Sequence, residues 1–272
     1  MNKQQLTEAL AACGMRPGRG LGQNFLLDNN LLDCIVRSAK VAAGMNILEV
    51  GPGFGALTRK MLEAGAHVYS IEFDRRLCEY LRRELGNEPN FHLIEGDACK
   101  VDFDSVVPRP FRAVANLPYS ISSVFIARLL ELKEPPEGCF FMLQKEMAQR
   151  LSAVPGCGNY GALSVRAGML YRLKLVRLVP PEVFFPPPEV ESALLEAELL
   201  ADMPPEKVRQ RVDRLARMAF NQRRKKLTNT LGTEFGAERI REVLATIGVN
   251  TDARPEALSV KEFIALADAL EI

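Results

Sequence analysis

The sequence predicts an α/β protein with a mostly parallel sheet, covered by helices on both faces and followed by a small helical domain. Between residues 46 and 144, strand-like apolar runs alternate with helix-like segments, and this alternation is typical of parallel sheets. Beyond the Met-Pro-Pro at residues 203–205, every periodic segment has helical spacing. We therefore expect an α/β domain over residues 1–200 and a helical domain over residues 201–272.

The predicted strands fall into two groups. Short strands occupy the alternating region, at residues 46–50, 67–72, 91–95, 112–116 and 138–144. Helical spacing separates some of them, at residues 56–64, 75–85 and 122–132. Two longer strand-like segments, 171–179 and 190–199, follow each other without a helix between them, which favours an antiparallel pair at the sheet edge.

Composition and residue content exclude several classes of protein. The chain has 272 residues, of which 47% are hydrophobic, and its apolar runs are only strand-length, so we expect a globular protein without a membrane span. The N-terminus lacks the apolar core of a signal peptide, so we expect a cytoplasmic protein. Cysteines occur without a C-x-x-C pair, and His67 and His92 lie in strand-like runs, so we expect no metal site. The sequence gives no sign of an oligomer, and we expect a monomer.

Positive charge is concentrated in one segment of the helical domain. Residues 206–227 contain nine Lys or Arg residues against two acidic residues, whereas the whole chain has a net charge of only +1. An apolar stripe at helical spacing runs along this segment, so its basic residues are expected to point away from the core; the stripe consists of Val208, Val212, Leu215 and Ala219. A solvated helix face explains such a run, but directed contact with a polyanion is the functional interpretation.

A glycine-rich turn follows the first predicted strand. The segment Glu49-Val50-Gly51-Pro52-Gly53-Phe54-Gly55 links that strand to a helix, and Gly51 and Gly53 let the backbone turn tightly and approach a ligand. Glu72 ends the second strand, where an acidic group can accept hydrogen bonds from both ribose hydroxyls of an adenosine. Asp97 ends the third strand, and we expect it to accept from the adenine amine. Together these residues predict a nucleoside-cofactor site.

The sequence of this turn is compatible with two different cofactors. Gly51, Gly53 and Ala56 also fit the G-x-G-x-x-A form of the dinucleotide fingerprint, so a nicotinamide dehydrogenase is an alternative. Pro52 stiffens the turn and removes an amide donor, and Asp97 suits an adenine and a cationic sulfonium better than a pyrophosphate. These two features favour S-adenosyl-L-methionine, which has no pyrophosphate.

The fourth predicted strand ends in Asn116-Leu117-Pro118-Tyr119, which suits chemistry on the exocyclic amine of adenine. The lone pair of that amine is delocalised into the ring, so an enzyme must localise it and align it with a methyl donor. The Asn116 side-chain oxygen and the main-chain carbonyl of Leu117 or Pro118 are candidate acceptors for the amine protons. Pro118 fixes the turn, and Tyr119 offers a stacking face for an extruded base. Taken alone, the tetrapeptide also fits an ordinary turn.

With these residues in place, the chain resembles the ribosomal RNA adenine N6-dimethyltransferase family, most closely its bacterial small-subunit members. The resemblance implies a Rossmann-like class I methyltransferase fold with a seven-stranded sheet. The segment Leu21-Gly22-Gln23-Asn24-Phe25-Leu26 is similar to the family's N-terminal cofactor motif and implies that Asn24 and Leu26 lie over the cofactor. Phe184 matches the family's second aromatic, which implies stacking on the target base. Core packing is the alternative for Phe184 and Phe185, and we expect one of them to be functional.

A basic signature of the family also matches the end of the charged segment, Phe220-Asn221-Gln222-Arg223-Arg224-Lys225-Lys226-Leu227. It implies RNA contacts by Arg223, Arg224, Lys225 and Lys226. The resemblance further implies dimethylation, with S-adenosyl-L-methionine, of two adjacent adenines in a hairpin near the 3′ end of 16S rRNA within the immature small ribosomal subunit. Two alternatives stay open: a non-catalytic rRNA-binding assembly factor, and methylation of an adenine in large-subunit rRNA.

Overall fold

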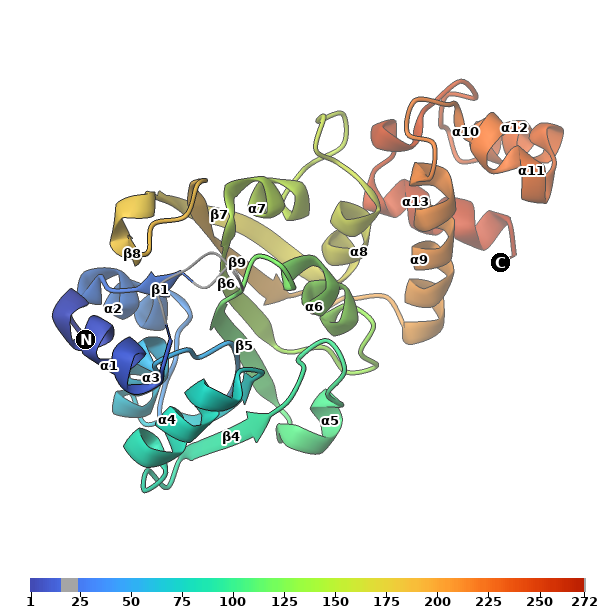
Figure 1. The fold of residues 1–272 in the computed structure, drawn as a ribbon. Helices are drawn as coiled ribbons and strands as arrows, with labels where there is room; N and C mark the ends of the chain where they lie inside the picture. The colour runs from blue at the N-terminus through green and yellow to red at the C-terminus, as the bar shows by residue number, and fades with distance from the viewer. Residues whose placement is uncertain (16–23, 272) are drawn as a thin grey trace. The chain divides into compact units, whose positions relative to one another are not determined.

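The structure is a computed structural model that describes residues 1–15 and 24–271, and it divides into two compact units (Figure 1). The first unit comprises Met1–Leu129, Pro136–Ala148 and Lys174–Glu198. The second unit comprises Leu130–Pro135, Gln149–Leu173 and Leu199–Ile272. Two earlier segments thus group with the C-terminal part of the chain, whereas the predicted domains, 1–200 and 201–272, are each continuous. The part of the predicted N-terminal cofactor motif before Asn24 lies outside the described residues.

Seven strands form one sheet, in the order β4-β3-β2-β5-β6-β9-β7. Their bounds are β2 (Asn46–Val50), β3 (His67–Glu72), β4 (Phe91–Glu95), β5 (Phe111–Asn116), β6 (Gly138–Gln144), β7 (Tyr171–Val179) and β9 (Ser192–Leu199). Neighbouring strands from β4 to β6 are parallel, and β9 is antiparallel to β6. The predicted α/β fold with a seven-stranded sheet is confirmed, and β9 and β7 lie side by side at one edge.

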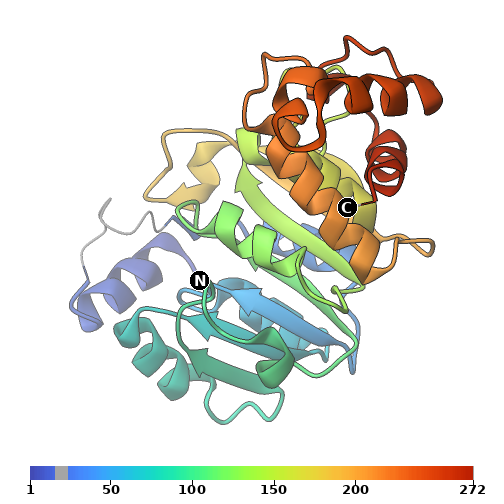
Figure 2. The ribbon, with the colours of Figure 1, turned by 90° about the vertical axis from the view of Figure 1, so that its right-hand side faces the viewer.

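Helices cover both faces of this sheet (Figures 1 and 2). Those of the first unit are α1 (Lys3–Ala12), α2 (Asn29–Ser38), α3 (Ala56–Glu63), α4 (Arg75–Leu85), α5 (Phe103–Val106) and α6 (Ser122–Leu129). On one face, Leu32 of α2 and Met61 of α3 pack in the same core cluster as Met142 of β6. On the other face, Phe125 of α6 packs edge-on against Phe141, which precedes Met142 and so points the opposite way.

Local signals explain where several of these elements begin and end. The Asp28 side chain accepts a hydrogen bond from an amide of the first turn of α2, and Asp74 caps α4 in the same way. The helix α6 ends at Leu129, three residues before the predicted end at residue 132. Beside the main sheet, β1 (Phe25–Leu26) and β8 (Phe184–Phe185) form a two-stranded antiparallel sheet.

The second unit is helical around its own apolar core. Its helices are α8 (Ala162–Leu170), α9 (Glu206–Phe220), α10 (Leu227–Thr230), α11 (Gly232–Phe235), α12 (Ala237–Thr246) and α13 (Val260–Ala269), and α7 (Lys145–Leu151) spans the division between the units. The predicted apolar stripe is confirmed, because Val212, Leu215 and Ala219 are fully buried and Val208 is half-buried. Phe263 of α13 belongs to the same core.

One basic residue of α9 is buried with this core. Arg209 is only 6% exposed, and its guanidinium donates to the main-chain carbonyls of Leu132 and Lys133 at 3.0 and 2.7 Å. The prediction that the basic residues of this helix point away from the core is therefore wrong at Arg209. Its charge is held by two peptide carbonyls, which attach the Leu130–Pro135 segment to the helical unit.

Two further observations concern membrane-spanning helices and metal sites. Within residues 1–15 and 24–271, no helix has both the length and the apolar character needed to cross a bilayer. In the same part of the chain, no group of three or more His, Cys, Asp or Glu side chains is arranged to bind a metal ion.

Candidate cofactor and base-binding site

The site lies where the strand order of the sheet reverses. From β2 the chain builds β3 and β4 on one side and later β5 and β6 on the other, so the carboxyl ends of β2 and β5 flank a crevice. The glycine turn follows β2, and Asn116 ends β5. Gly51 has a φ of +67°, and a Cβ there would lie 2.9 Å from Pro118 Cγ. The two turns therefore touch, and only glycine fits at this contact.

Two cavities open at this point and share Gly51, Glu72 and Pro118 in their walls. Other walls of the first cavity include Asn24, Leu26, Glu49, Gly53, Asn116, Leu117 and Tyr119. Other walls of the second cavity include Phe73, Asp74, Asp97, Ala98 and Ile121. Every residue that the sequence predicted for cofactor binding lines one of these cavities.

Glu72 is held in place by main-chain amides. One carboxylate oxygen accepts from the amides of Phe73 and Asp74 at 2.8 and 2.9 Å, and the other accepts from Gly53 at 3.3 Å. Burial raises the pKa of Glu72, and the three amide donors oppose that rise. A carboxylate offers about four acceptor positions. About one position therefore remains for a ligand hydroxyl in this arrangement.

The loop after β4 presents Asp97 to the second cavity. One Asp97 oxygen accepts from the Cys99 amide at 2.9 Å. Arg128 of α6 donates to the carbonyls of Ala98 and Val101, both at 2.9 Å. These bonds attach the loop to the helix that begins just after the Asn116–Tyr119 turn, so the acidic end of the cavity is fixed to the candidate reaction site.

Phe73 is a residue of this site that sequence analysis missed. Its side chain is 71% exposed although it is aromatic, and it lines the second cavity beside Asp97. An exposed aromatic ring next to a cavity offers an apolar face to a flat ligand such as a purine. The available signal was its position directly after Glu72 at the end of β3.

Glu49 is a second residue of this site whose role sequence analysis missed, although its segment was quoted there. It is fully buried at the wall of the first cavity, and one of its oxygens accepts from the hydroxyls of Thr58 and Ser70, both at 2.7 Å. Burial raises the pKa of Glu49 to about 7, the two hydroxyl donors oppose the rise, and the nearby Glu72 adds to it. A carboxyl group that titrates near neutral pH beside a cavity can lose its proton when a cation binds.

The Asn116 side chain is oriented by the segment that covers the cavity. Asn116 Nδ2 donates to the Asn24 carbonyl at 3.3 Å. Because a carbonyl only accepts, this contact assigns the nitrogen to that side and leaves Oδ1 as an acceptor for a ligand. The Pro118 carbonyl already accepts from the Ile121 amide at 3.2 Å, whereas no donor in the described part of the chain reaches the Leu117 carbonyl. Leu117 is therefore the better of the two predicted main-chain acceptors.

Tyr119 lines the first cavity and is held at its far end. Its hydroxyl lies 2.6 Å from Oγ of Ser192, which is fully buried at the start of β9. Burial raises the pKa of Tyr119, and the bond to Ser192 opposes the rise. Ser192 is a third residue of this site that sequence analysis missed, because the sequence does not show which residue meets the Tyr119 hydroxyl.

The two aromatic residues of the proline-rich segment have different surroundings. Phe184 is 3% exposed and packs with Leu26 in the core of the first unit. Phe185 is half-buried, and Lys3 Nζ lies 4.9 Å from the centre of its ring. In this structure Phe184 therefore contributes to packing, and its stacking on a target base stays a prediction.

The predicted RNA-binding cations of the second unit fall into two pairs. Arg223 Nη2 donates to the carbonyls of Gly158 and Tyr160, both at 2.7 Å, and Lys226 Nζ lies 2.9 Å from Asp252 Oδ1. Arg223 and Lys226 thus have structural partners.

Arg224 and Lys225 form the other pair. Both are exposed, and within the described residues neither side chain forms a hydrogen bond or an ion pair. They are therefore the cations of the signature that are free to contact a polyanion.

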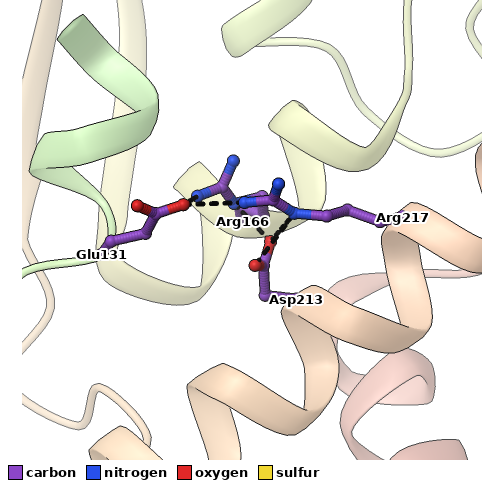
Figure 3. Close-up of polar contacts among 4 residues, drawn as sticks. All are labelled: Glu131, Arg166, Asp213 and Arg217. Atoms are coloured by element: carbon purple, nitrogen blue, oxygen red, sulfur yellow. Dashed lines mark hydrogen bonds and ion pairs between the residues drawn. The ribbon is translucent and has the colours of Figure 1, made fainter. Parts of the chain in front are cut away.

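Three of the five basic residues of α9 have acidic partners inside the second unit. Arg217 of α9 and Arg166 of α8 each bond to both Glu131 and Asp213, at distances of 2.5 to 3.0 Å (Figure 3). Two further pairs connect α9 to later residues: Arg211 with Asp268, and Arg214 with Glu234. Four of the nine basic residues in the segment 206–227 thus have acidic partners in the folded unit: Arg211, Arg214, Arg217 and Lys226.

Comparison with known proteins identifies the family of the chain. The model of the family described as ribosomal RNA adenine dimethylase matches residues 17–271. A protein of Pseudomonas savastanoi pv. phaseolicola named ribosomal RNA small subunit methyltransferase A is 41% identical over 258 residues, which cover 94% of this chain and 95% of that protein. A protein of the same name from Alkaliphilus oremlandii is 39% identical over 263 residues, which cover 93% and 91%.

Solved structures of similar proteins share the fold. A dimethyladenosine transferase from Plasmodium falciparum matches with a TM-score of 0.77 and 25% identity, over 89% of this chain and 95% of that one. The 23S rRNA methyltransferase ErmE matches with a TM-score of 0.71 and 26% identity, over 92% of this chain and 100% of that one. The match to the family model and the identity to relatives extend through both compact units. The chain therefore belongs to the ribosomal RNA adenine dimethylase family and is a methyltransferase.

Proposed function

We propose that the protein uses S-adenosyl-L-methionine to dimethylate the exocyclic amines of two adjacent adenines in a hairpin near the 3′ end of 16S rRNA, within the immature small ribosomal subunit. The observation that carries the proposal is the contact of the glycine turn at Gly51 with the turn that presents Asn116 and Leu117. The small-subunit names of relatives at 41% and 39% identity favour 16S rRNA over large-subunit rRNA.

The residues of the two cavities fit this cofactor. Glu72 retains an acceptor position for a ribose hydroxyl, and Phe73 and Asp97 suit the face and the amine of an adenine. Glu49 is an acid beside the first cavity, where the cofactor's ammonium group would find a counter-charge. When bound, the cofactor supplies a methyl group on a positively charged sulfur, which is already an activated electrophile.

The reaction then depends on how the protein holds the target amine. Asn116 Oδ1 and the Leu117 carbonyl accept its two N–H groups, which concentrates the lone pair on nitrogen and directs it into the crevice. The Tyr119 ring stacks on the extruded base. The proton that the amine loses after methyl transfer passes to water, because a protonated exocyclic amine is a strong acid. After one transfer the amine keeps one N–H group, which one acceptor can hold for the second transfer.

Methyl transfer to RNA tests the proposal directly. Undermethylated small subunits, incubated with tritiated S-adenosyl-L-methionine, should gain label with the wild-type protein. We expect Asn116→Ala to lower kcat by about 100-fold or more, because one of two aligned acceptors is lost. Cofactor affinity, measured by calorimetry, should change little. Binding to the subunit without any wild-type transfer would instead favour the non-catalytic assembly factor.

The target position needs a separate experiment. Mapping of dimethyladenine in rRNA from cells with and without this protein should show loss of the two adjacent modifications in 16S rRNA. Loss of a modification in large-subunit rRNA would overturn the small-subunit assignment. Tight binding of NAD without binding of S-adenosyl-L-methionine would overturn the cofactor assignment.

We further propose that the second unit contacts RNA phosphates through Arg224 and Lys225. Support comes from their exposure and their lack of partners among the described residues, in contrast to Arg223 and Lys226.

A protein with this substrate would act in the cytoplasm, and we propose that it acts as a monomer. Light scattering of the purified protein, alone and with the subunit, tests the oligomeric state.

A further inference from the structure

We propose that Ser192 is a positioning residue whose hydroxyl holds the Tyr119 ring at the angle that stacks on the target adenine. The inference rests on the function proposed above. It starts from the 2.6 Å separation of the two hydroxyl oxygens, which lies within the range of an O–H···O hydrogen bond. Tyr119 belongs to the wall of the same cavity as Asn116, so the orientation of its ring shapes the space that receives the base.

The main chain at Tyr119 is already fixed without Ser192. The Ile121 amide donates to the Pro118 carbonyl at 3.2 Å, and Ser122 Oγ donates to the Tyr119 carbonyl at 3.2 Å. With the backbone held, the remaining freedom of Tyr119 is rotation of its side chain about two torsions. The bond between the ring hydroxyl and Ser192 restricts this rotation.

The position of Ser192 is itself fixed by strand pairing in the sheet. It is fully buried and begins β9, which is paired with β6 from Gln144 opposite Ser192 to Gly138 opposite Glu198. The preceding residue, Glu191, is tied to Lys145 by an ion pair of 2.6 Å and by a main-chain hydrogen bond of 3.0 Å. The hydroxyl that meets Tyr119 therefore has a position set by the sheet and not by a mobile loop.

A ring held in this way affects the chemical step more than the affinity for RNA. The phosphate contacts that we propose for the second unit supply binding, whereas the tyrosine ring aligns the amine with its acceptors and the methyl group. Loss of the Ser192 hydroxyl should therefore lower kcat with little change in KM for the subunit. The second transfer should suffer more than the first, because the monomethylated amine has one N–H group fewer to hold it, so monomethyladenine should accumulate.

A double-mutant cycle tests the inference. We expect Ser192→Ala and Tyr119→Phe each to lower kcat by about tenfold. We expect the double variant to be no slower than either single variant, because both substitutions remove the same bond. Effects that multiply in the double variant, or single variants with wild-type kcat and wild-type product ratios, would overturn the proposal.

A matched control separates positioning from a general loss of packing. Ser164→Ala removes another buried hydroxyl, which bonds to the Arg150 carbonyl within the second unit and not to Tyr119. We expect it to preserve the ratio of monomethylated to dimethylated product. An equal shift of that ratio in Ser164→Ala and Ser192→Ala would contradict a specific role for the ring hydroxyl. Thermal melts and cofactor calorimetry on each variant identify any variant that fails to fold.

The bond can also be measured without methylation, which separates this inference from the proposed function. Tyrosine labelled with ¹³C at Cζ reports the phenol titration by NMR. Since the Ser192 contact lowers the pKa of Tyr119 against the effect of burial, Ser192→Ala should raise that pKa further. An unchanged titration would show that the hydroxyls do not interact, whether or not the wild-type protein methylates RNA.

Discussion

The two regions that the sequence marked for function, the strand-end site and the basic segment of residues 206–227, fare differently in the structure. At the strand ends, the predicted residues Gly51, Glu72 and Asn116 meet around adjoining cavities. In the basic segment, four of the nine basic residues have acidic partners, and Arg209 is buried. The sequence therefore predicts where a residue lies in the fold better than it predicts whether a charged side chain is free to bind a ligand.

The physical reason lies in what each kind of site requires. A ligand site at the carboxyl ends of parallel strands needs particular residues directly after each strand, and the topology brings those ends together. A polyanion site needs cations without internal partners. Those partners come from distant segments, as with Arg223 and the carbonyl of Gly158, which are 65 residues apart. Substitutions in both regions test this difference.

The largest effect is expected at the contact between the two turns. Gly51→Ala places a Cβ 2.9 Å from Pro118 Cγ, in a backbone conformation that suits glycine, so the reaction-site turn must move. We expect kcat/KM to fall by about 100-fold or more, since displacements of about 1 Å at a reaction site have effects of that size. Steady-state methylation of small subunits measures the loss.

Gly44→Ala is the matched control for this substitution. Gly44 also has a positive φ, +79°, but a Cβ there meets no atom within 4 Å. It should lose about 1–2 kcal/mol of stability from backbone strain and retain methylation activity. Equal losses of activity in the two variants would show that strain, and not the contact with Pro118, disables the site.

The next effect concerns the buried Glu49 carboxyl and pH. Its pKa is raised by burial to about 7 in the folded protein from an ordinary value of 4.5, so the folded state binds the proton more tightly. Stability from this group is fully present below pH 4.5 and is lost as pH rises through 7. The loss amounts to at most about 3 kcal/mol.

The variant Glu49→Gln isolates this contribution. It cannot ionise, so its free energy of unfolding should fall less than that of the wild type between pH 5 and pH 8. Denaturant unfolding at several pH values measures the difference between the two proteins. Parallel pH profiles would indicate that Glu49 does not titrate in this range.

The smallest effect is expected in the basic signature, where the contrast is sharpest. Arg224→Ala/Lys225→Ala removes two unpaired cations and should reduce the slope of log K against log salt for subunit binding by about 1.4–1.8. Arg223→Ala/Lys226→Ala removes the same charge from paired residues and should change the slope less, but should lower the melting temperature. Equal slopes in the two double variants would show that internal pairing does not decide which cations contact RNA.

Sequence alone predicted the α/β fold, the bounds of the seven main-sheet strands to within two residues, and the residues at the strand ends that line the two cavities. These depend on local patterns: apolar periodicity, glycine after a strand, and an acid or amide at a strand's last residue. The family resemblance added the reaction, and the match to the ribosomal RNA adenine dimethylase model confirms the family.

Tertiary structure alone decided which side chains meet across long stretches of chain. Tyr119 and Ser192 are 73 residues apart, and Asn116 and Asn24 are 92 residues apart. The packing of Phe184 and the pairing of basic residues such as Arg223 depend on such contacts. Hydrogen bonds and ion pairs act over a few ångströms, so only the folded chain determines which partners lie within reach.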